Sequence, residues 1–271
     1  MGIYNVRIRK SNSEEIAMTV YILQIIAMAT MLCDHIAGLF LDDMVALRCI
    51  GRFAFPIYAL LIAEGYRHIK HDKSRVTSHL GGYITLAVIS EICYDFAESE
   101  ALTVASFMES QNCIITLLLG FLGLMAIDYW KDKKKLYMWA AIALTAMLNF
   151  MVLSNYKFAG VLLIYAFYAY LNQFDGKTYM RRFVLLLAIF ACYIPIYHWA
   201  RCNFCGPAEY VEKLKGTLTW WYLTHIPIAA LLATYTGKKG NAPKIFRTIY
   251  RYFYPGHLFI LGIIRHLVFG I

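Results

Sequence analysis

The chain has 271 residues, of which 60% are hydrophobic and only 16% are charged, with a formal net charge of +9. A soluble globular protein is about 45–50% apolar and about 25% charged. This composition therefore excludes an ordinary soluble domain and predicts a membrane protein with several spans. The basic residues fall in short loops between apolar runs, a pattern that indicates membrane topology rather than nucleic-acid binding.

The apolar runs predict an all-α polytopic bundle of about nine transmembrane helices, forming a single domain over 1–271 after a cytoplasmic lead-in at 1–15. About 20 helical residues cross the hydrocarbon core. The first run continues past the small residues at 27 and 29 without a polar cleavage region, so we expect a retained anchor that Asp34 and His35 close. The nine runs lie at 16–33, 46–64, from 80 to 90, 110–127, 136–156, 158–174, 183–200, 216–237 and 252–269.

The distribution of basic residues predicts the orientation. If nine spans alternate from a cytoplasmic N-terminus, the cytoplasmic segments hold 19 of the 26 Lys and Arg residues, the outer loops hold four, and three lie within spans. Cytoplasmic loops carry such an excess of Lys and Arg. The N-terminus is therefore predicted in the cytoplasm and the C-terminus outside, in a bacterial cytoplasmic membrane.

Polar residues cluster at the predicted outer ends of the spans. A charge at membrane depth costs about 2.5–3.5 kcal/mol, so such residues are expected to be paired or functional. Several of them are four positions apart and therefore share a helix face. We expect them to converge on one pocket, although they can also be ion pairs that only fix helix packing. They are Asp34, His35, Arg48, Arg52, Glu91, Asp95, Asn112 and Thr116.

His35 is the candidate general base of this cluster. Its sequence neighbour Asp34 is a carboxylate, and Glu91 and Asp95 are expected nearby, so the imidazole can be tuned for proton transfer near neutral pH. One of these carboxylates is predicted to orient the ring. The simpler alternative is a solvated or hydrogen-bonded histidine at a helix end.

The predicted cytoplasmic side is basic and aromatic. Arg67, His68, Arg251 and His257 are predicted to hold a phosphorylated, adenine-bearing ligand. The alternative is that they are topology determinants beside anionic lipid. Glu64 lies sixteen residues after Arg48, roughly 24 Å along a helix, and so cannot belong to the outer cluster. With Asn112 and Thr116 it is predicted to contact substrate.

The seven cysteines include one C-x-x-C pair, Cys202 and Cys205, with His198 close by. A disulfide, a redox pair and part of a metal site are all open for this pair. The other five cysteines lie in apolar runs and are interpreted as small core residues. No metal is expected.

Six segments of the chain together form a recognisable pattern: CDHIA at 33–37, RCIGRFAFPIY at 48–58, AEGYRH at 63–68, ISEICYD at 89–95, NCIITL at 112–117 with Gly120, and YFYPGHL at 252–258. In these segments and their order the chain resembles the TraX family, membrane acetyltransferases named for the N-terminal acetylation of conjugative pilin. Cys93, Ala37 and Gly256 depart from the family pattern, in which proline, glycine and leucine are expected.

The resemblance implies acyl transfer from acetyl-CoA, the donor substrate. The expected acceptor is a peptide or pilin-like N-terminal amine, and the alternative is a hydroxyl of a glycan or lipid. We expect cytosolic acetyl-CoA to dock near Arg67, Arg251 and His257, with its thioester reaching His35. Arg48 or Arg52 would stabilise the tetrahedral oxyanion, and an acetyl-imidazole on His35 is a variant of this mechanism.

Two other functional classes remain open. A transporter can use paired intramembrane charges as a substrate or proton path, but the sequence has no clear inverted repeat. A non-catalytic assembly factor would use the polar cluster only for structure. The sequence specifies neither the acceptor nor the oligomeric state.

Overall fold

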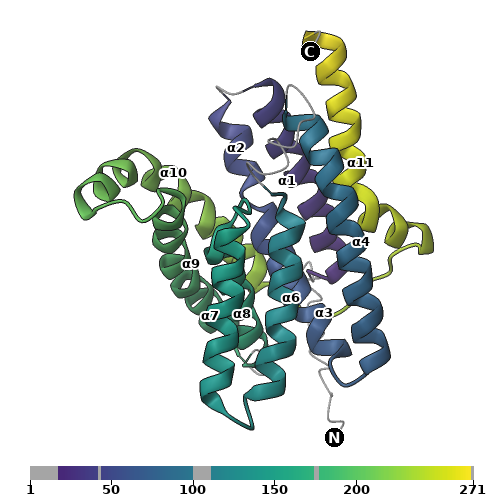
Figure 1. Ribbon diagram of the computed structural model, residues 1–271, viewed down its shortest axis with the longest axis vertical. Helices are drawn as coiled ribbons and strands as arrows, with labels where there is room; N and C mark the ends of the chain where they lie inside the picture. Colours follow the sequence, from purple (N-terminus) through teal and green to yellow (C-terminus); the bar gives the residue numbers. More distant parts are fainter. Residues whose placement is uncertain (1–17, 42–43, 100–110, 174–176, 270–271) are drawn as a thin grey trace, which may run out of the picture.

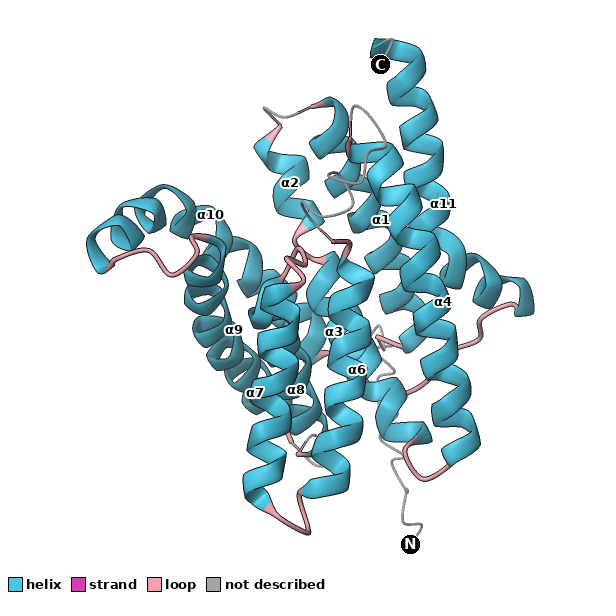
Figure 2. Ribbon diagram, viewed as in Figure 1, coloured by secondary structure: helices cyan, strands magenta, loops and turns pink. Residues whose placement is uncertain are grey.

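The computed structural model describes residues 18–41, 44–99, 111–173 and 177–269, so the predicted lead-in at 1–15 lies outside the described residues. Within them the chain is helical, with two isolated bridges and no strands (Figure 2). The predicted all-α bundle is confirmed. The helices are α1 (Val20–Phe40), α2 (Val45–Gly51), α3 (Ala54–Ile69), α4 (Lys73–Glu98), α6 (Cys113–Trp130), α7 (Lys135–Met151), α8 (Lys157–Asn172), α9 (Tyr179–Arg201), α10 (Pro207–Ala233) and α11 (Lys244–Phe269).

Six helical segments of the described chain are long and apolar enough to cross a membrane, which makes this an integral membrane protein. They are Val20–Phe40, Val45–Ile69, Lys73–Glu98, Cys113–Trp130, Tyr179–Arg201 and Lys244–Phe269. Three shorter apolar helices, Lys135–Met151, Lys157–Asn172 and Thr224–Ala233, fall below that length. The count of nine spans and the orientation of the termini stay predictions.

Two predicted boundaries are wrong. Asp34 and His35 do not close the first helix, because α1 continues past them to Phe40. The second span is not one continuous helix either. It breaks at Arg52 and Phe53, between α2 and α3. The first difference places Asp34 and His35 within a helix, and the second places Arg52 at a helix end inside the predicted span.

Local sequence explains several helix starts. Thr19 accepts a hydrogen bond from the backbone N–H of Ile22 at the start of α1, and Asp72 accepts one from Arg75 at the start of α4. Asn112 does the same for Ile114 at the start of α6, over 2.8 Å. Each side chain satisfies a backbone donor that the first turn of a helix leaves without a partner.

The helices form one bundle with α4 and α11 on one flank and α9 and α10 on the other (Figure 1). The chain between α10 and α11 lies along the start of α1. There the N–H groups of Val20 and Tyr21 donate to the carbonyl oxygens of Lys238 and Lys239 over 2.9 and 3.1 Å. This contact brings the basic segment before α11 to the same end of the bundle as the α3–α4 turn.

Candidate functional site

A cavity of about 1150 Å³ lies inside the bundle and is lined by side chains from both of its ends. Ligand pockets usually have volumes of about 300–1,000 Å³. We call one end the His35 end, lined by Asp34, His35, Arg48 and Arg52, and the other the Arg251 end, lined by Arg75, Lys239, Arg247 and Arg251. Along α1 the lining runs from Val20 to His35, roughly 22 Å of helix.

The side chain of His35 contacts a second histidine from the far end of the chain. Its Nδ1 atom lies 2.6 Å from Nε2 of His257 on α11, and the two rings are stacked. Nδ1 of His257 lies 2.6 Å from the carbonyl oxygen of Phe253 on the same helix. The ring of Tyr254 meets both imidazoles edge-on.

This chain of hydrogen bonds assigns the tautomers. The carbonyl oxygen of Phe253 can only accept, so Nδ1 of His257 carries the proton and its Nε2 accepts when the ring is neutral. The Nδ1–H of His35 then donates to His257. Nε2 of His35 is left without a proton, in a side chain that lines the cavity. Such a nitrogen can accept a proton from a bound nucleophile.

Asp34 and Arg48 form an ion pair at the same end, with Nη1 of Arg48 3.8 Å from Oδ1 of Asp34. Two glycines allow α1 and α2 to approach this closely. A Cβ atom on Gly51 would overlap the Asp34 side chain, and one on Gly38 would lie 3.0 Å from Nη1 of Arg48. Asp34 therefore holds Arg48, and it is His257 that contacts the His35 ring.

Arg52 lies at the break between α2 and α3 and also lines the cavity. Its charge interacts with Asp34 and with the hydroxyls of Tyr156 and Tyr197. The break positions the guanidinium beside the cavity, where it can stabilise negative charge that develops on a bound ligand.

The middle of the cavity is mostly apolar and aromatic. Tyr58 of α3 stacks on Tyr250 of α11, with ring centroids 5.9 Å apart, and both line it. Met31, Leu61 and Leu117 contribute aliphatic and thioether surface. This stretch suits an uncharged, extended part of a ligand, whereas its two ends suit charged groups.

The Arg251 end combines four cations with a buried carboxylate. Glu64 is 2% exposed, accepts a hydrogen bond from the Tyr235 hydroxyl over 3.0 Å, and lies 3.3 Å from Arg67 and 3.1 Å from His68. Glu64 and His68 line the cavity. Arg67 instead donates to the carbonyl oxygen of Leu171, so its guanidinium is turned towards α8.

The predicted convergence of all the outer polar residues is wrong. The cavity lining of the described chain includes none of Glu91, Asp95, Asn112 and Thr116. Glu91 instead accepts hydrogen bonds from the side chain and the backbone N–H of Asn112. The Thr116 hydroxyl donates to Ser154 over 3.0 Å. These contacts hold α4, α6 and the α7–α8 turn together, so we assign these residues a role in helix packing.

The predicted position of His257 is also wrong. Sequence reasoning grouped it with Arg251 because only six residues separate them. That separation spans nearly two helical turns, roughly 9 Å, and the side chain of His257 contacts His35. Arg251 stays at the end with the other cations, as expected.

The structure adds cationic lining residues to those predicted for the site. Arg75 and Arg247 lie in the basic cytoplasmic segments that the sequence offered either for a phosphorylated ligand or as topology determinants, and Lys239 was counted only as a loop charge. Lys157 and Arg201 were counted only as outer-loop charges. The sequence signal for them was the pairing of basic residues with tyrosines in the segments before α8 and α11.

Comparison with known proteins decides the family. The sequence matches the TraX protein family over residues 20–265, which is most of the chain. The chain belongs to the TraX family. The predicted resemblance is confirmed, and the matched range includes every cavity-lining residue named above.

One curated protein with a similar sequence is the probable fimbrial assembly protein FimC of serogroup H1 from Dichelobacter nodosus. It is 29% identical over 121 residues, which cover 42% of this chain and 48% of the relative. The match thus spans about half the length of that protein. No solved structure matches this chain.

Proposed function

We propose that this TraX protein is a membrane acetyltransferase that moves an acetyl group from acetyl-CoA to an acceptor bound at the His35 end of the cavity. The observation that carries the proposal is the continuous cavity, which joins a cluster of cations to a histidine with an unprotonated ring nitrogen. A long donor with an anionic head and a neutral arm matches that distribution of charge.

The Arg251 end takes the nucleotide of acetyl-CoA. Arg75, Arg247, Arg251 and Lys239 offer the cations that phosphates prefer. Tyr83 is an aromatic surface for the adenine. In the predicted orientation this end faces the cytoplasm, where acetyl-CoA is made. The pantetheine arm occupies the aromatic and aliphatic middle, and the thioester reaches His35.

His35 acts as the general base. Its Nε2 takes the proton of an acceptor amine or hydroxyl as the acceptor atom attacks the thioester carbonyl. The tetrahedral intermediate carries an oxyanion, which Arg52 or Arg48 stabilises. When the C–S bond breaks, the CoA thiolate leaves and receives the proton from His35. The products are the acetylated acceptor and free CoA, so the base is restored.

His257 is a positioning residue in this scheme. It accepts from the Nδ1–H of His35 and so keeps the lone pair of the other nitrogen towards the cavity. The protonated form of His35 during the reaction donates the same hydrogen bond more strongly, because its donor is then charged.

The acceptor in this proposal is a peptide with a free N-terminal amine, at the outer face of a bacterial cytoplasmic membrane. The printed name of the relative, a fimbrial assembly protein, supports a pilin-like peptide. An O-acetyltransferase acting on a glycan or lipid is the alternative, because the same base serves a hydroxyl.

Binding of radiolabelled acetyl-CoA to the purified full-length protein tests the donor assignment. Saturable binding that unlabelled CoA displaces is the expected result. A folded, monodisperse sample that binds no acetyl-CoA, together with proton-coupled uptake in proteoliposomes, would instead make the cavity a transport path.

A further inference from the structure

A second group of polar residues lies beside the His35 end, and the proposed chemistry uses only its Arg52. Lys157 and Arg201 line the cavity together with Arg52 and Asn203. We call these four residues the Lys157 cluster. They come from the α2–α3 break, the start of α8 and the α9–α10 loop, so three separate parts of the chain converge there.

The members of the cluster are linked by short contacts. Nζ of Lys157 donates to Oδ1 of Asn203 over 2.6 Å. Arg201 donates to the Tyr197 hydroxyl over 3.4 Å, and the charge of Arg52 interacts with that same tyrosine. Asn203 is neutral, so its hydrogen bond to Lys157 leaves the positive charge of the group in place.

Among the described residues that line this end of the cavity, cations outnumber carboxylates: the cations are Arg48, Arg52, Lys157 and Arg201, and the carboxylates are Asp34 and Glu98. Asp34 is engaged with Arg48. Burial and the neighbouring charge of Arg201 both lower the pKa of the Lys157 ammonium, which precedes the apolar part of α8. A bound anion would relieve that repulsion.

The backbone of the cluster is held in a conformation that costs energy. The described chain has four residues other than glycine with positive φ, and three of them line the cavity: Leu153 at 53°, Lys157 at 45° and Asn203 at 52°. Such conformations are strained, persist only where the surroundings enforce them, and are concentrated at binding sites.

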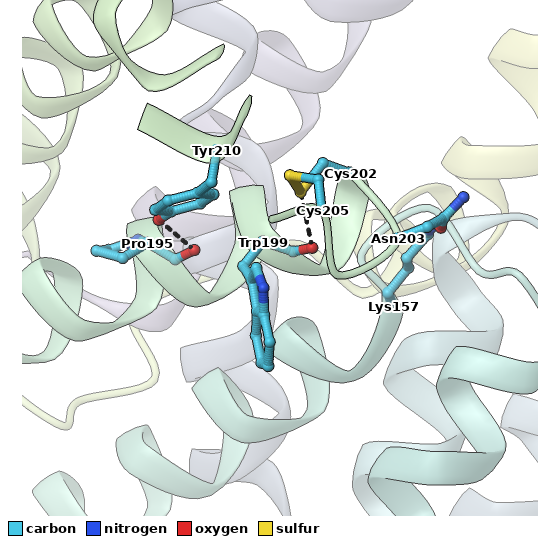
Figure 3. Close-up of a disulfide and its surroundings, with 7 residues drawn as sticks. All are labelled: Lys157, Pro195, Trp199, Cys202, Asn203, Cys205 and Tyr210. Carbon is cyan, nitrogen blue, oxygen red and sulfur yellow. Dashed lines mark hydrogen bonds between the residues drawn. A yellow bond between two sulfur atoms is a disulfide. The ribbon is translucent and has the colours of Figure 1, made fainter. Parts of the chain in front are cut away.

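The disulfide between Cys202 and Cys205 closes the loop that carries Asn203 (Figure 3). Within this loop Asn203 donates from its backbone to Ala200, and Phe204 donates to Trp199. Figure 3 shows the Asn203 side chain lying against Lys157. The C-x-x-C pair, whose role the sequence left open, thus fixes the residue that orients the Lys157 ammonium.

We propose that the Lys157 cluster binds an oxyanion carried by the acceptor, so that the acceptor of this enzyme is an anionic molecule with a phosphate or carboxylate near its reacting amine or hydroxyl. The identification of the bound molecule as the acceptor rests on the proposed function, but the oxyanion site itself does not depend on it. Arginine forks and a lysine ammonium pair with either oxyanion, but three cations attract a nearly doubly charged phosphate monoester more strongly than a singly charged carboxylate.

The test measures binding of small oxyanions to the full-length protein in detergent by isothermal titration calorimetry. Glycerol 3-phosphate and glycerate carry a phosphate and a carboxylate on the same frame, and glycerol is the neutral control. The variants are Lys157→Gln/Arg201→Gln and, as a control with the same loss of charge at exposed residues outside the cavity lining, Lys133→Gln/Lys134→Gln. The single variant Arg201→Gln changes an exposed residue, so it keeps the test possible if the double variant does not fold.

We expect glycerol 3-phosphate to bind more tightly than glycerate, and glycerol not to bind. Loss of the two cations should weaken binding of glycerol 3-phosphate at least about tenfold, while the control pair changes it less than twofold. Weakening only in the control pair, or equal weakening in both, would overturn the inference. Oxyanion binding that follows the Lys157 cluster in a protein that does not bind acetyl-CoA would keep this site and refute the proposed function.

Discussion

Nδ1 of His35 lies 2.6 Å from Nε2 of His257, although the two residues are 222 positions apart in the chain. The backbone carbonyl of Phe253 fixes the proton on the other nitrogen of His257. These contacts make the orientation and tautomer of His35 depend on α11. The proposed base is therefore supported by an imidazole, in the place where sequence reasoning expected a carboxylate.

Replacing His257 should slow acetyl transfer by an amount that depends on whether the new side chain can accept a hydrogen bond from His35. His257→Leu removes the acceptor for the Nδ1–H of His35, so we expect kcat to fall about five- to 150-fold, corresponding to the loss of a buried partner. His257→Gln offers an amide oxygen and should recover part of that loss. The measurement is the initial rate of CoA release with acceptor present.

The KM for acetyl-CoA should change little in both His257 variants. An increase in KM with unchanged kcat would return His257 to the donor site, where the sequence had put it. Equal rates for the Leu and Gln variants would show that the hydrogen bond to His35 has no part in the reaction.

Arg247→Gln and Arg251→Gln should weaken donor binding. Each cation is proposed to contact a phosphate, so each variant should raise the KM for acetyl-CoA about ten- to a hundredfold. The kcat should stay close to normal, because the contacts are the same in the ground state and the transition state. Steady-state rates over a range of acetyl-CoA concentrations measure both constants.

His71→Gln, on the exposed turn before α4 and outside the cavity lining, is a suitable control for that experiment. It should leave both constants near the wild-type values. If the arginine variants lowered kcat and left KM unchanged, the Arg251 end would not be the donor site.

The approach of α1 to α2 should be sensitive to a single methyl group. Gly51→Ala places a Cβ atom where Asp34 lies, so we expect a loss of about 1–3 kcal/mol in the free energy of unfolding, as for other overpacked sites. Gly81→Ala on α4 is the matched control, since a Cβ there meets nothing within 4 Å. Thermal unfolding of both variants in the same detergent compares them.

A stability of Gly51→Ala equal to that of Gly81→Ala would contradict the close packing of these two helices. Because Asp34 is paired with Arg48, the Gly51 variant should also lose transfer activity at temperatures where it remains folded. The Gly81 variant should not.

Much of the fold followed from composition and apolar runs, because bilayer thickness sets the length of a spanning helix. The same runs did not reveal the break at Arg52 and Phe53, because an isolated glycine such as Gly51 is also tolerated within a helix and Pro56 also fits the first turn of one. Nor did they show that α1 continues past Asp34 and His35. A polar pair at the end of an apolar run looks like a helix end unless the neighbouring helices are known.

His35, Arg48 and Arg52, which the sequence grouped together, line one cavity with Arg251. Their roles in the reaction stay predictions. The partnership of His35 with His257 was not predictable, because it depends on how α11 packs beside α1. Glu91 and Asn112 were wrongly predicted to lie at the cavity, for a physical reason. Polar residues four apart share a helix face, but that face can meet another helix as readily as a cavity.

The most direct test of the account is loss of the labelled thioester of acetyl-CoA in purified wild-type protein beside His35→Ala. The account predicts that both proteins bind acetyl-CoA with similar affinity, and that transfer in the variant is about 10²- to 10⁴-fold slower, the usual contribution of a general base. Near-normal turnover in a folded His35→Ala protein would contradict the central claim that this histidine removes the proton from the acceptor.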